Sequence, residues 1–217
     1  MTDQQGQKLA VALAAAELVE DGMSVGLGTG STVELLLPAL AGRGLSLRCV
    51  ATSPRTAEAA RALGLIIEPF EGVERLDIAI DGADQVAPDG WLVKGGGAAH
   101  TREKLIETAA DRFVVMVDES KLVAAIVPPI PLELMAFGIA SVLRSLAPSV
   151  IRDVPRSPDG GIIADFRGSV GGPAALAARF DATPGLVEHG LFPPDMVSEI
   201  LIGRADGSVE RRPVRGA

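Results

Sequence analysis

Two hydrophobic periods alternate along the first half of the chain. Residues 7–20 place apolar side chains three and four positions apart, which predicts an amphipathic helix closed by Asp21-Gly22. Short apolar runs with the length of buried strands lie between further helical patterns, at residues 23–27, 47–51, 65–67, 76–80 and 113–117. Strands and helices that alternate in this way are typical of a parallel sheet with helices on its faces.

Polar residues before two of the predicted helices indicate where these helices begin. Ser31 or Thr32 is expected to cap the helix that follows. Ser53 is expected to cap the next helix, which has Pro54 at its first position.

The pattern changes near residues 127–129, and the second half predicts strand, helix, two strands, helix and strand. This order is the ferredoxin-like split motif. A hairpin is expected at residues 199–214, around Ala205-Asp206-Gly207. The predicted elements of the split motif lie at residues 132–135, 136–146, 150–154, 161–165, 173–180 and 186–189. The fold class is therefore α/β, with a larger parallel-sheet domain expected at 1–128 and 205–217 and a smaller α+β domain expected at 129–204.

Composition and charge limit the function. The 217 residues carry a formal net charge of −8, which argues against nucleic acid as a partner because phosphate backbones require a basic face. No apolar run reaches membrane-spanning length. The single cysteine, Cys49, cannot form an internal disulfide and fits a reducing cytoplasm, where we expect it to pack in a strand. Two histidines and one cysteine leave little material for a transition-metal site.

The first loop that could carry chemistry is Gly26-Leu27-Gly28-Thr29-Gly30-Ser31-Thr32, between a predicted strand and a predicted helix. Glycines let the backbone approach a ligand, and the helix N-terminus offers N–H groups to an anion. The loop is not the dinucleotide fingerprint, because Ser31 replaces the third glycine and no acid follows the second strand. A plain turn is the alternative, but a phosphate site is favoured.

Two further loops could carry chemistry, and the first of them follows a predicted strand. Asp81-Gly82-Ala83-Asp84 brings two carboxylates to the sheet edge where α/β proteins bind ligands, although an ordinary Asp-Gly turn is the alternative. Lys94 enters a loop of three glycines, Gly95, Gly96 and Gly97, and could stabilise an oxyanion there.

The helix after the glycines carries Glu103 on a partly apolar face, where a carboxyl group suits a general base. A solvated glutamate beside Arg102 and Lys104 is the alternative. His100 and Lys121 are weaker candidates, since a lone histidine is more often a packing or surface residue and a lone lysine is more often solvated. Lys121 does follow the fifth predicted strand and is therefore expected at the same sheet edge.

These loops, in this order, resemble the ribose-5-phosphate isomerase A family. The segments that carry the resemblance are Gly-Leu-Gly-Thr-Gly-Ser-Thr, Asp-Gly-Ala-Asp, Lys-Gly-Gly-Gly-Ala-Ala-His-Thr-Arg-Glu-Lys and Asp-Glu-Ser-Lys, followed by Pro131-Leu132-Glu133 and the segments 160–165 and 184–192. Each segment alone is weak, but the ordered set is specific and spans nearly the whole chain.

The resemblance implies a Rossmann-like domain with an inserted α+β domain, in a homodimer or homotetramer without a metal or cofactor. It implies interconversion of D-ribose 5-phosphate and D-ribulose 5-phosphate in the non-oxidative pentose phosphate pathway. Glu103 would transfer the proton through a cis-enediolate, with Asp81, Asp84 and Lys94 as the other catalytic residues. Lys8 is assigned to the phosphate. The substrate-binding residues would be Thr29, Gly30, Ser31, Thr32, Gly82, Ala83, Gly95, Gly96, Gly97 and Lys121.

Two positions depart from the family pattern. Gln85 stands where Glu is usual, and His100 stands where an apolar residue is common. The rival functions are a sugar-phosphate sensor, an aminosugar-phosphate deaminase, a CoA transferase and a dinucleotide-dependent oxidoreductase. The sensor is disfavoured because no DNA-binding segment precedes Gly26, and the oxidoreductase because the fingerprint is incomplete.

Overall fold

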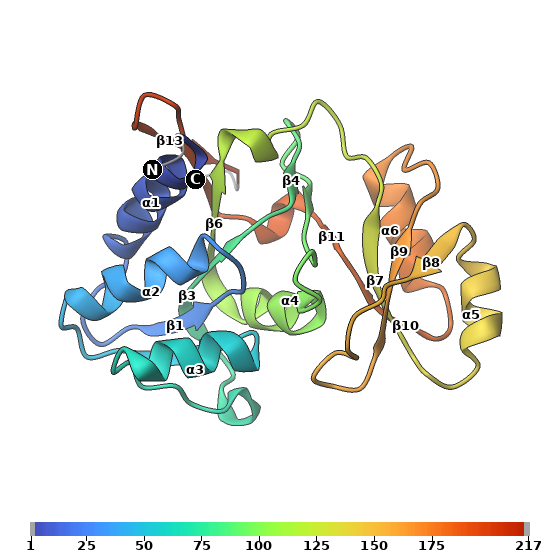
Figure 1. Cartoon of the computed structure of the whole chain (residues 1–217), viewed down its shortest axis with the longest axis horizontal. Helices are drawn as coiled ribbons and strands as arrows, with labels where there is room; N and C mark the ends of the chain where they lie inside the picture. Colours follow the sequence, from blue (N-terminus) through green and yellow to red (C-terminus); the bar gives the residue numbers. More distant parts are fainter. Residues whose placement is uncertain (1–2, 215–217) are drawn as a thin grey trace. The chain divides into compact units, whose positions relative to one another are not determined.

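The computed structural model describes residues 3–214, which form two compact units (Figure 1). Unit 1 contains the residues up to Ala83, the segment Arg102–Leu122 and the residues from Pro194 onward. Unit 2 contains Asp84–Thr101 and Val123–Pro193. Each unit has a hydrophobic core of its own.

Unit 1 is built on a six-stranded sheet in the order β13-β12-β6-β3-β1-β2. All neighbouring strands are parallel except the β12–β13 pair, which is the predicted hairpin. The expected strand at 65–67 is wrong: Ile67 forms an isolated parallel bridge with Cys49, and Pro69, two residues further on, has no N–H to extend the pairing. The strands are β1 (Ser24–Leu27), β2 (Arg48–Ala51), β3 (Leu76–Gly82), β6 (Ala110–Asp118), β12 (Glu199–Gly203) and β13 (Val209–Pro213).

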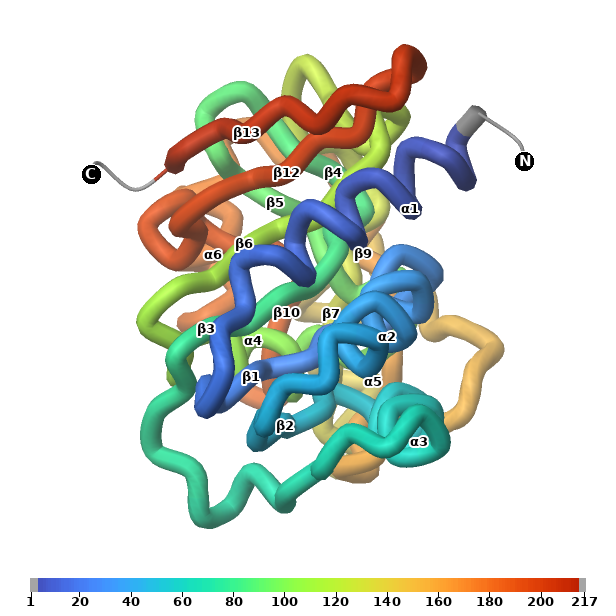
Figure 2. The backbone as a smooth tube through the Cα atoms, turned by 90° about the vertical axis from the view of Figure 1, so that its left-hand side faces the viewer, coloured from blue at the N-terminus to red at the C-terminus, as the bar shows by residue number. Residues whose placement is uncertain are grey.

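Helices cover both faces of this sheet. The helix α1 (Asp3–Ala16) lies across β6 and β12 (Figure 2), and it packs in the same core as α2 (Val33–Gly42) and α3 (Pro54–Ala62). The helix α4 (His100–Thr108) contacts the opposite face, where Ile106 lies against Gly26 of β1. Three 3-10 turns complete the described helices: η1 (Phe70–Gly72), η2 (Glu119–Lys121) and η3 (Pro194–Met196).

The first helix ends earlier than the apolar pattern predicts. It stops at Ala16 rather than Glu20 because the chain tightens, with Leu18 N donating to Ala15 O at 3.0 Å. The guanidinium of Arg43 then donates to the carbonyl oxygens of Ala16 and Val19, which satisfies this helix end from outside the helix.

Unit 2 contains the predicted split motif. Its four-stranded antiparallel sheet has the order β10-β7-β9-β8, so that β9 separates β7 from β8. Residues of α5 and α6 share a core with alternate residues of β7 and β9, among them Leu132 and Ala164. The elements are β7 (Ile130–Leu134), α5 (Ile139–Ser145), β8 (Ser149–Ile151), β9 (Ile162–Phe166), α6 (Pro173–Asp181) and β10 (Leu186–His189).

A second sheet in unit 2 has no counterpart in the sequence prediction. It joins β4 (Gln85–Val86), β5 (Leu92–Val93) and β11 (Leu191–Phe192) in the order β11-β5-β4. Strands of two residues are too short to show an alternating pattern.

The expected domain boundaries, 129 and 204, need correction. Unit 2 already begins at Asp84, because β5 pairs with β11 far along the chain. It ends at Pro193, because β12 adds in parallel to β6 of the large sheet. The tertiary pairing of short strands decides both boundaries.

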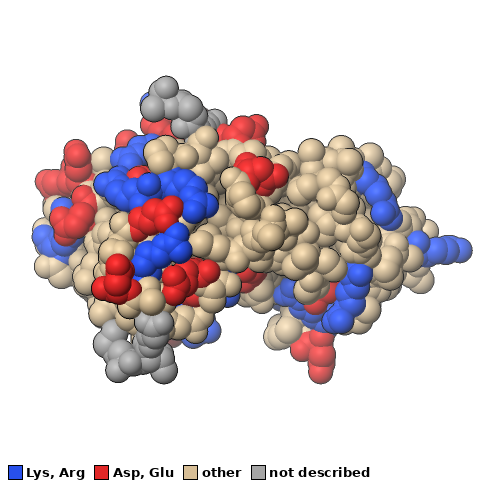
Figure 3. Space-filling view, turned by 90° about the horizontal axis from the view of Figure 1, so that it is seen from above, with Lys and Arg blue, Asp and Glu red and all other residues tan. Residues whose placement is uncertain are grey.

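Surface charges in unit 1 are paired along the β12–β13 hairpin. Arg211 donates to Glu199 at 2.6 Å, and Arg212 donates to Glu210 at 3.0 Å. Figure 3 shows basic side chains beside acidic ones on the face seen from above.

No helix within residues 3–214 is both long and apolar enough to cross a membrane.

Candidate active site

The parallel strands of unit 1 end at one edge of the sheet, and polar residues follow there. Thr29 lies just after β1, Thr52 directly follows β2, Asp81 is the last residue but one of β3, and Asp118 is the last residue of β6. Open α/β sheets bind their ligands at this carboxyl edge. The Asp81 loop was predicted at such an edge, and the strand directions agree.

Asp81 is fixed by the loop after β1. Its Oδ1 accepts hydrogen bonds from Thr29 N at 3.0 Å and from Gly82 N at 2.6 Å, and the residue is 1% exposed. A Cβ at Gly28 would lie 1.9 Å from the Asp81 carboxyl group. Only glycine at this position therefore lets the carboxylate reach the backbone donors.

Threonine hydroxyls hold the loop after β1 in place. Thr29 Oγ1 lies 2.7 Å from Thr52 Oγ1, and Thr56 Oγ1 donates to Gly28 O at 2.9 Å. Neither Thr52 nor Thr56 was predicted as a site residue. Thr52 directly follows a predicted strand, so its position at the carboxyl edge was a usable signal.

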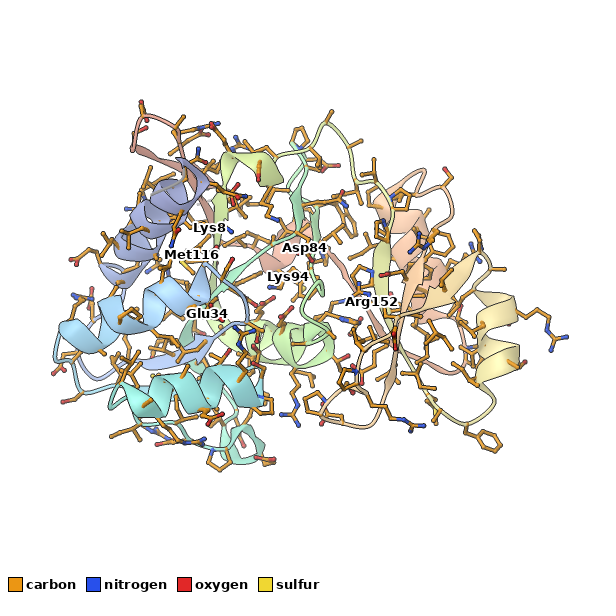
Figure 4. All side chains as sticks on the ribbon, in the orientation of Figure 1. Lys8, Glu34, Asp84, Lys94, Met116 and Arg152 are labelled. Atoms are coloured by element: carbon orange, nitrogen blue, oxygen red, sulfur yellow. The ribbon has the colours of Figure 1, made fainter. Side chains whose placement is uncertain are left out.

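The start of α2 is left without a side-chain cap. Thr32 makes no capping hydrogen bond, and Ser31 Oγ instead accepts from Lys8 Nζ of α1 at 3.0 Å, so the predicted cap is wrong (Lys8 is labelled in Figure 4). Gly30 has a φ of 135°, which turns the exposed loop into the helix. The first N–H groups of a helix have no intrahelical partner, so this loop and Lys8 suit an anion.

Asp118 ends β6 beside the same loops. Its carboxylate accepts from Ser120 N at 3.1 Å and from Gln4 Nε2 at 3.3 Å. Burial raises the pKa of Asp118, but hydrogen bonds from Ser120 and Gln4 and the charge of Lys8 outweigh burial and leave the pKa below its ordinary value. Lys121, a predicted site residue, lies half-buried in η2 just beyond.

Glu103 lies in the first turn of α4 and is 3% exposed. Ile106, one turn further on the same face, packs against Gly26 and so places this face on the sheet. Ala79 of β3 also lies next to Gly26, beside Ile106, and Asp81 lies two residues after Ala79 and so on the same face of the sheet. A helix leading into a parallel strand runs back from the carboxyl edge. The first turn of α4 therefore lies toward the edge that carries Asp81.

In unit 2, Lys94 follows β5 and is 2% exposed. Its backbone N donates to Gly190 O at 2.9 Å, and its Nζ lies 5.5 Å from the centre of the Phe192 ring. A cation over an aromatic face is stabilised by the ring quadrupole. The pairing of β5 with β11 thus holds both ends of this lysine.

Asp84 is joined to the glycine loop within unit 2. Its Oδ2 accepts from Gly96 N at 2.7 Å, and its own N donates to Val93 O at 2.7 Å. A Cβ at Gly96 would lie 2.6 Å from Asp84 Oδ1. Asp84 and Lys94 are both labelled in Figure 4.

The glycine loop has a constrained backbone. Gly95 has a φ of 101°, and a Cβ there would lie 2.6 Å from Nδ1 of the buried His100. Ala98 has a φ of 60°, a left-handed conformation that non-glycine residues rarely adopt. Such strain persists where surrounding contacts determine the backbone, often at functional sites.

Each unit by itself thus brings predicted site residues together. The carboxyl edge of unit 1 carries the phosphate-type loop, Asp81, Glu103 and Lys121, and unit 2 carries Asp84, Lys94 and the three glycines. Among residues 3–214, no group of three or more histidine, cysteine or carboxylate side chains is placed to hold a metal ion.

Comparison with known proteins decides the family. Residues 48–207 match the family model described as Ribose 5-phosphate isomerase A (phosphoriboisomerase A). The chain belongs to the ribose-5-phosphate isomerase A family. The resemblance seen in the sequence is confirmed, and the protein is an isomerase.

Curated ribose-5-phosphate isomerases A from distant organisms are similar over most of their length. The protein from Caulobacter vibrioides is 43% identical over 216 residues, covering 92% of this chain and 95% of its own. The protein from Natronomonas pharaonis is 42% identical, covering 94% of this chain and 95% of its own.

Solved structures of the family share the fold. Ribose 5-phosphate isomerase A from Neisseria gonorrhoeae has a TM-score of 0.93 at 28% identity and covers all of both chains. The enzyme from Methanocaldococcus jannaschii has a TM-score of 0.89 at 34% identity, covering 95% of this chain and 98% of its own. A D-ribose-5-phosphate isomerase in complex with phospho-erythronic acid has a TM-score of 0.90 at 31% identity, covering 97% and 99%. The expected α/β fold class is confirmed.

Gln85, where this isomerase departs from the family pattern, has a structural explanation. Its Nε2 donates to Val127 O at 2.7 Å, and Val127 N donates to its Oε1 at 2.9 Å. An amide supplies both a donor and an acceptor, whereas an ionised glutamate could only accept. Gln85 therefore ties β4 to the segment that precedes β7.

Proposed function

We propose that this isomerase interconverts D-ribose 5-phosphate and D-ribulose 5-phosphate through a cis-enediolate, with Glu103 as the base, in the non-oxidative pentose phosphate pathway. The observation that carries the proposal is the buried position of Glu103 in the first turn of α4, on the sheet face that also bears Asp81. Moving the carbonyl from C1 to C2 requires removal of a proton from C2 and its return at C1. A single buried carboxylate above the plane of the intermediate can do both.

The phosphate of the substrate would bind at the start of α2. Gly30, Ser31 and Thr32 offer backbone N–H groups there, and Lys8 adds a positive charge beside Ser31. We expect Lys8→Met to raise KM for the sugar phosphate more than it lowers kcat, because the phosphate binds equally in the ground and transition states.

Asp81 and Asp84 would open the furanose ring and exchange protons with the sugar hydroxyls. Both carboxylates are already oriented by backbone donors, so little reorganisation is needed. Lys94 and the amides of its loop would stabilise the negative oxygen of the enediolate. A relative was solved in complex with phospho-erythronic acid, and this supports an enediolate intermediate, because a planar carboxylate carries two oxygens as an enediolate does.

The first test is NMR of D-ribose 5-phosphate with the pure protein in D2O, with EDTA and no added cofactor. We expect D-ribulose 5-phosphate to appear with solvent deuterium incorporated at the position of transfer. Product without deuterium would favour a hydride shift, and unchanged substrate with folded protein would contradict the proposed reaction. Release of ammonia from an aminosugar phosphate would then identify a deaminase.

A matched pair of glutamates tests the base. Glu103→Gln removes the proton acceptor and should abolish most of kcat while changing KM much less. Glu107, one turn further along α4 and also 3% exposed, provides the control. Glu107→Gln should retain most of kcat, and equal losses in the two variants would assign the effect to the helix rather than to Glu103.

We also propose that the protein works in the cytoplasm as a homodimer or homotetramer. Large apolar side chains are exposed in unit 2, notably Phe137 at 88% and Val150 at 51% in the edge strand β8. A second copy of the chain would remove such surface from water. Light scattering coupled to size exclusion should give a multiple of the 22.3 kDa chain, and Phe137→Ser should shift it toward the monomer.

A further inference from the structure

We propose that Arg152 is a positioning residue, which orients Asp84 through the peptide group between Gly95 and Gly96. The inference rests on the proposed function, in which Asp84 exchanges protons with the substrate. It assigns a part in the reaction to the four-stranded sheet of unit 2, beyond packing.

Arg152 holds the glycine loop by its carbonyl oxygens. Its Nη1 donates to Gly95 O at 2.8 Å and to Gly96 O at 3.3 Å. The residue directly follows β8, and its own backbone N donates to Ile163 O at 2.9 Å (Arg152 is labelled in Figure 4). Hydrogen bonds from a charged donor are about twice as strong as neutral ones.

Asp165 holds the guanidinium in turn. Its Oδ1 accepts from Arg152 Nε at 2.9 Å and from Nη2 at 2.6 Å, and both side chains are largely shielded, at 17% and 12% exposure. Asp165 lies in β9, a central strand whose neighbours are β7 and β8. The arginine is therefore anchored to the rigid part of the sheet.

The connection to Asp84 runs through one peptide plane. Gly95 O and Gly96 N belong to the same trans peptide, so they point to opposite sides of it. Arg152 binds the oxygen, and Asp84 Oδ2 accepts from the N–H at 2.7 Å. A cation at the carbonyl also polarises the amide and strengthens its N–H as a donor. Without Arg152, glycines on both sides of this peptide would let it rotate.

The other end of the loop is held by the same sheet. The carboxylate of Glu133 in β7 accepts from the hydroxyl groups of Thr101 and Ser157, and Glu133 is 2% exposed. Thr101 immediately precedes Arg102 and Glu103 on α4. Charged groups of the sheet thus fix the loop at its beginning and at its end.

The test combines kinetics with a double-mutant cycle. Arg152→Ala should lower kcat roughly 30-fold, because a displaced catalytic group costs up to about 100-fold, while KM changes less than about threefold. In the Asp84→Asn background the same substitution should cost less than about threefold, because its effect passes through Asp84. Arg156→Ala is the control, since this exposed arginine donates to Gly160 O at 3.3 Å, outside the segment 94–101, and its substitution should leave kcat unchanged.

A wild-type kcat in Arg152→Ala would overturn the proposal. An equal loss of kcat on adding Arg152→Ala to the wild type and to Asp84→Asn would also overturn it, because that result indicates a general structural effect. Hydrogen exchange supplies a readout independent of activity. Peptides covering residues 94–101 should exchange faster in Arg152→Ala than in the wild type or Arg156→Ala. Unchanged exchange would refute the idea that Arg152 holds the glycine loop. If the wild type shows no isomerisation, the proposed function fails, and the exchange measurement alone decides whether Arg152 fixes the loop.

Discussion

Gly28→Ala is the substitution whose effect follows most directly from the geometry of unit 1. The new Cβ would lie 1.9 Å from both Cγ and Oδ1 of Asp81, whereas ordinary contacts begin at 3.4 Å. The carboxyl group must therefore retreat by about 1.5 Å, because β1 and β3 are paired on both sides and cannot spread without losing sheet hydrogen bonds.

The retreat breaks the two hydrogen bonds that Asp81 accepts from Thr29 N and Gly82 N. Hydrogen bonds to a charged group contribute about 1.5–3 kcal/mol each. Some of this is regained when the carboxylate finds water or new donors, so we expect the free energy of unfolding to fall by about 2–4 kcal/mol. A catalytic group misplaced by more than 1 Å should also lower kcat by roughly 100-fold.

The assay is urea unfolding together with the rate of ribose 5-phosphate isomerisation. Gly42→Ala is the matched control, because nothing lies within 4 Å of a Cβ at this last residue of α2 and its φ is not positive. That variant should be as stable as the wild type or slightly more stable, with unchanged kcat. A stable and fully active Gly28→Ala protein would refute the role of Gly28 in placing Asp81.

Three further predictions concern unit 1. Because the pKa of Asp118 is lower in the folded chain than in the unfolded chain, its carboxylate stabilises the fold above the unfolded pKa, and this contribution disappears as the pH falls through the folded pKa. The stability gap between the wild type and Asp118→Asn should therefore shrink in urea titrations between about pH 6 and about pH 3, and a constant gap would contradict the shift. Ser53→Ala removes the Oγ that accepts from Thr56 N at 3.2 Å, and should lower the free energy of unfolding by about 1 kcal/mol. Ser53→Asp keeps a side-chain oxygen that can cap the helix, so this control should leave the free energy of unfolding unchanged. Burial, and to a lesser degree the charge of Glu68, raises the pKa of the Cys49 thiol to about 11. A thiol reagent at about pH 8 should therefore react with Cys49 only after denaturant is added. Prompt reaction of the native protein would show instead that the thiol is accessible.

Local rules predicted the features whose contacts are close along the chain. Ser53 caps α3 because the serine and the N–H it binds are three residues apart. The order of the split motif followed from periodicity, since each of its helices and most of its strands are long enough to show an apolar pattern. The Asp81 loop could be placed at the carboxyl edge of the sheet because α/β proteins with parallel strands bind ligands where the strands end.

Features that depend on distant residues could not be predicted in this way. Ser31 or Thr32 was expected to cap a helix, but Thr32 makes no capping hydrogen bond and the hydroxyl of Ser31 accepts from Lys8 on another helix. The boundary at residue 204 failed because β12 pairs with β6, which lies in a different part of the sequence. Thr56 and the arginine that holds the glycine loop escaped notice for the same reason, whereas Thr52 directly follows a predicted strand and could have been found.

The sequence by itself determined the fold class, the family and the set of polar loops, because helix caps, apolar periods and glycine-rich turns act over a few residues. The tertiary structure decided how each functional group is held. Thr29 and Asp81 are 52 positions apart, and Arg152 and Gly95 are 57 apart, so their hydrogen bonds exist only once the sheets have formed. A carboxylate acquires its orientation from the backbone donors that folding brings to it. A local sequence pattern spans only a few residues, so it cannot specify a hydrogen bond between residues more than 50 positions apart.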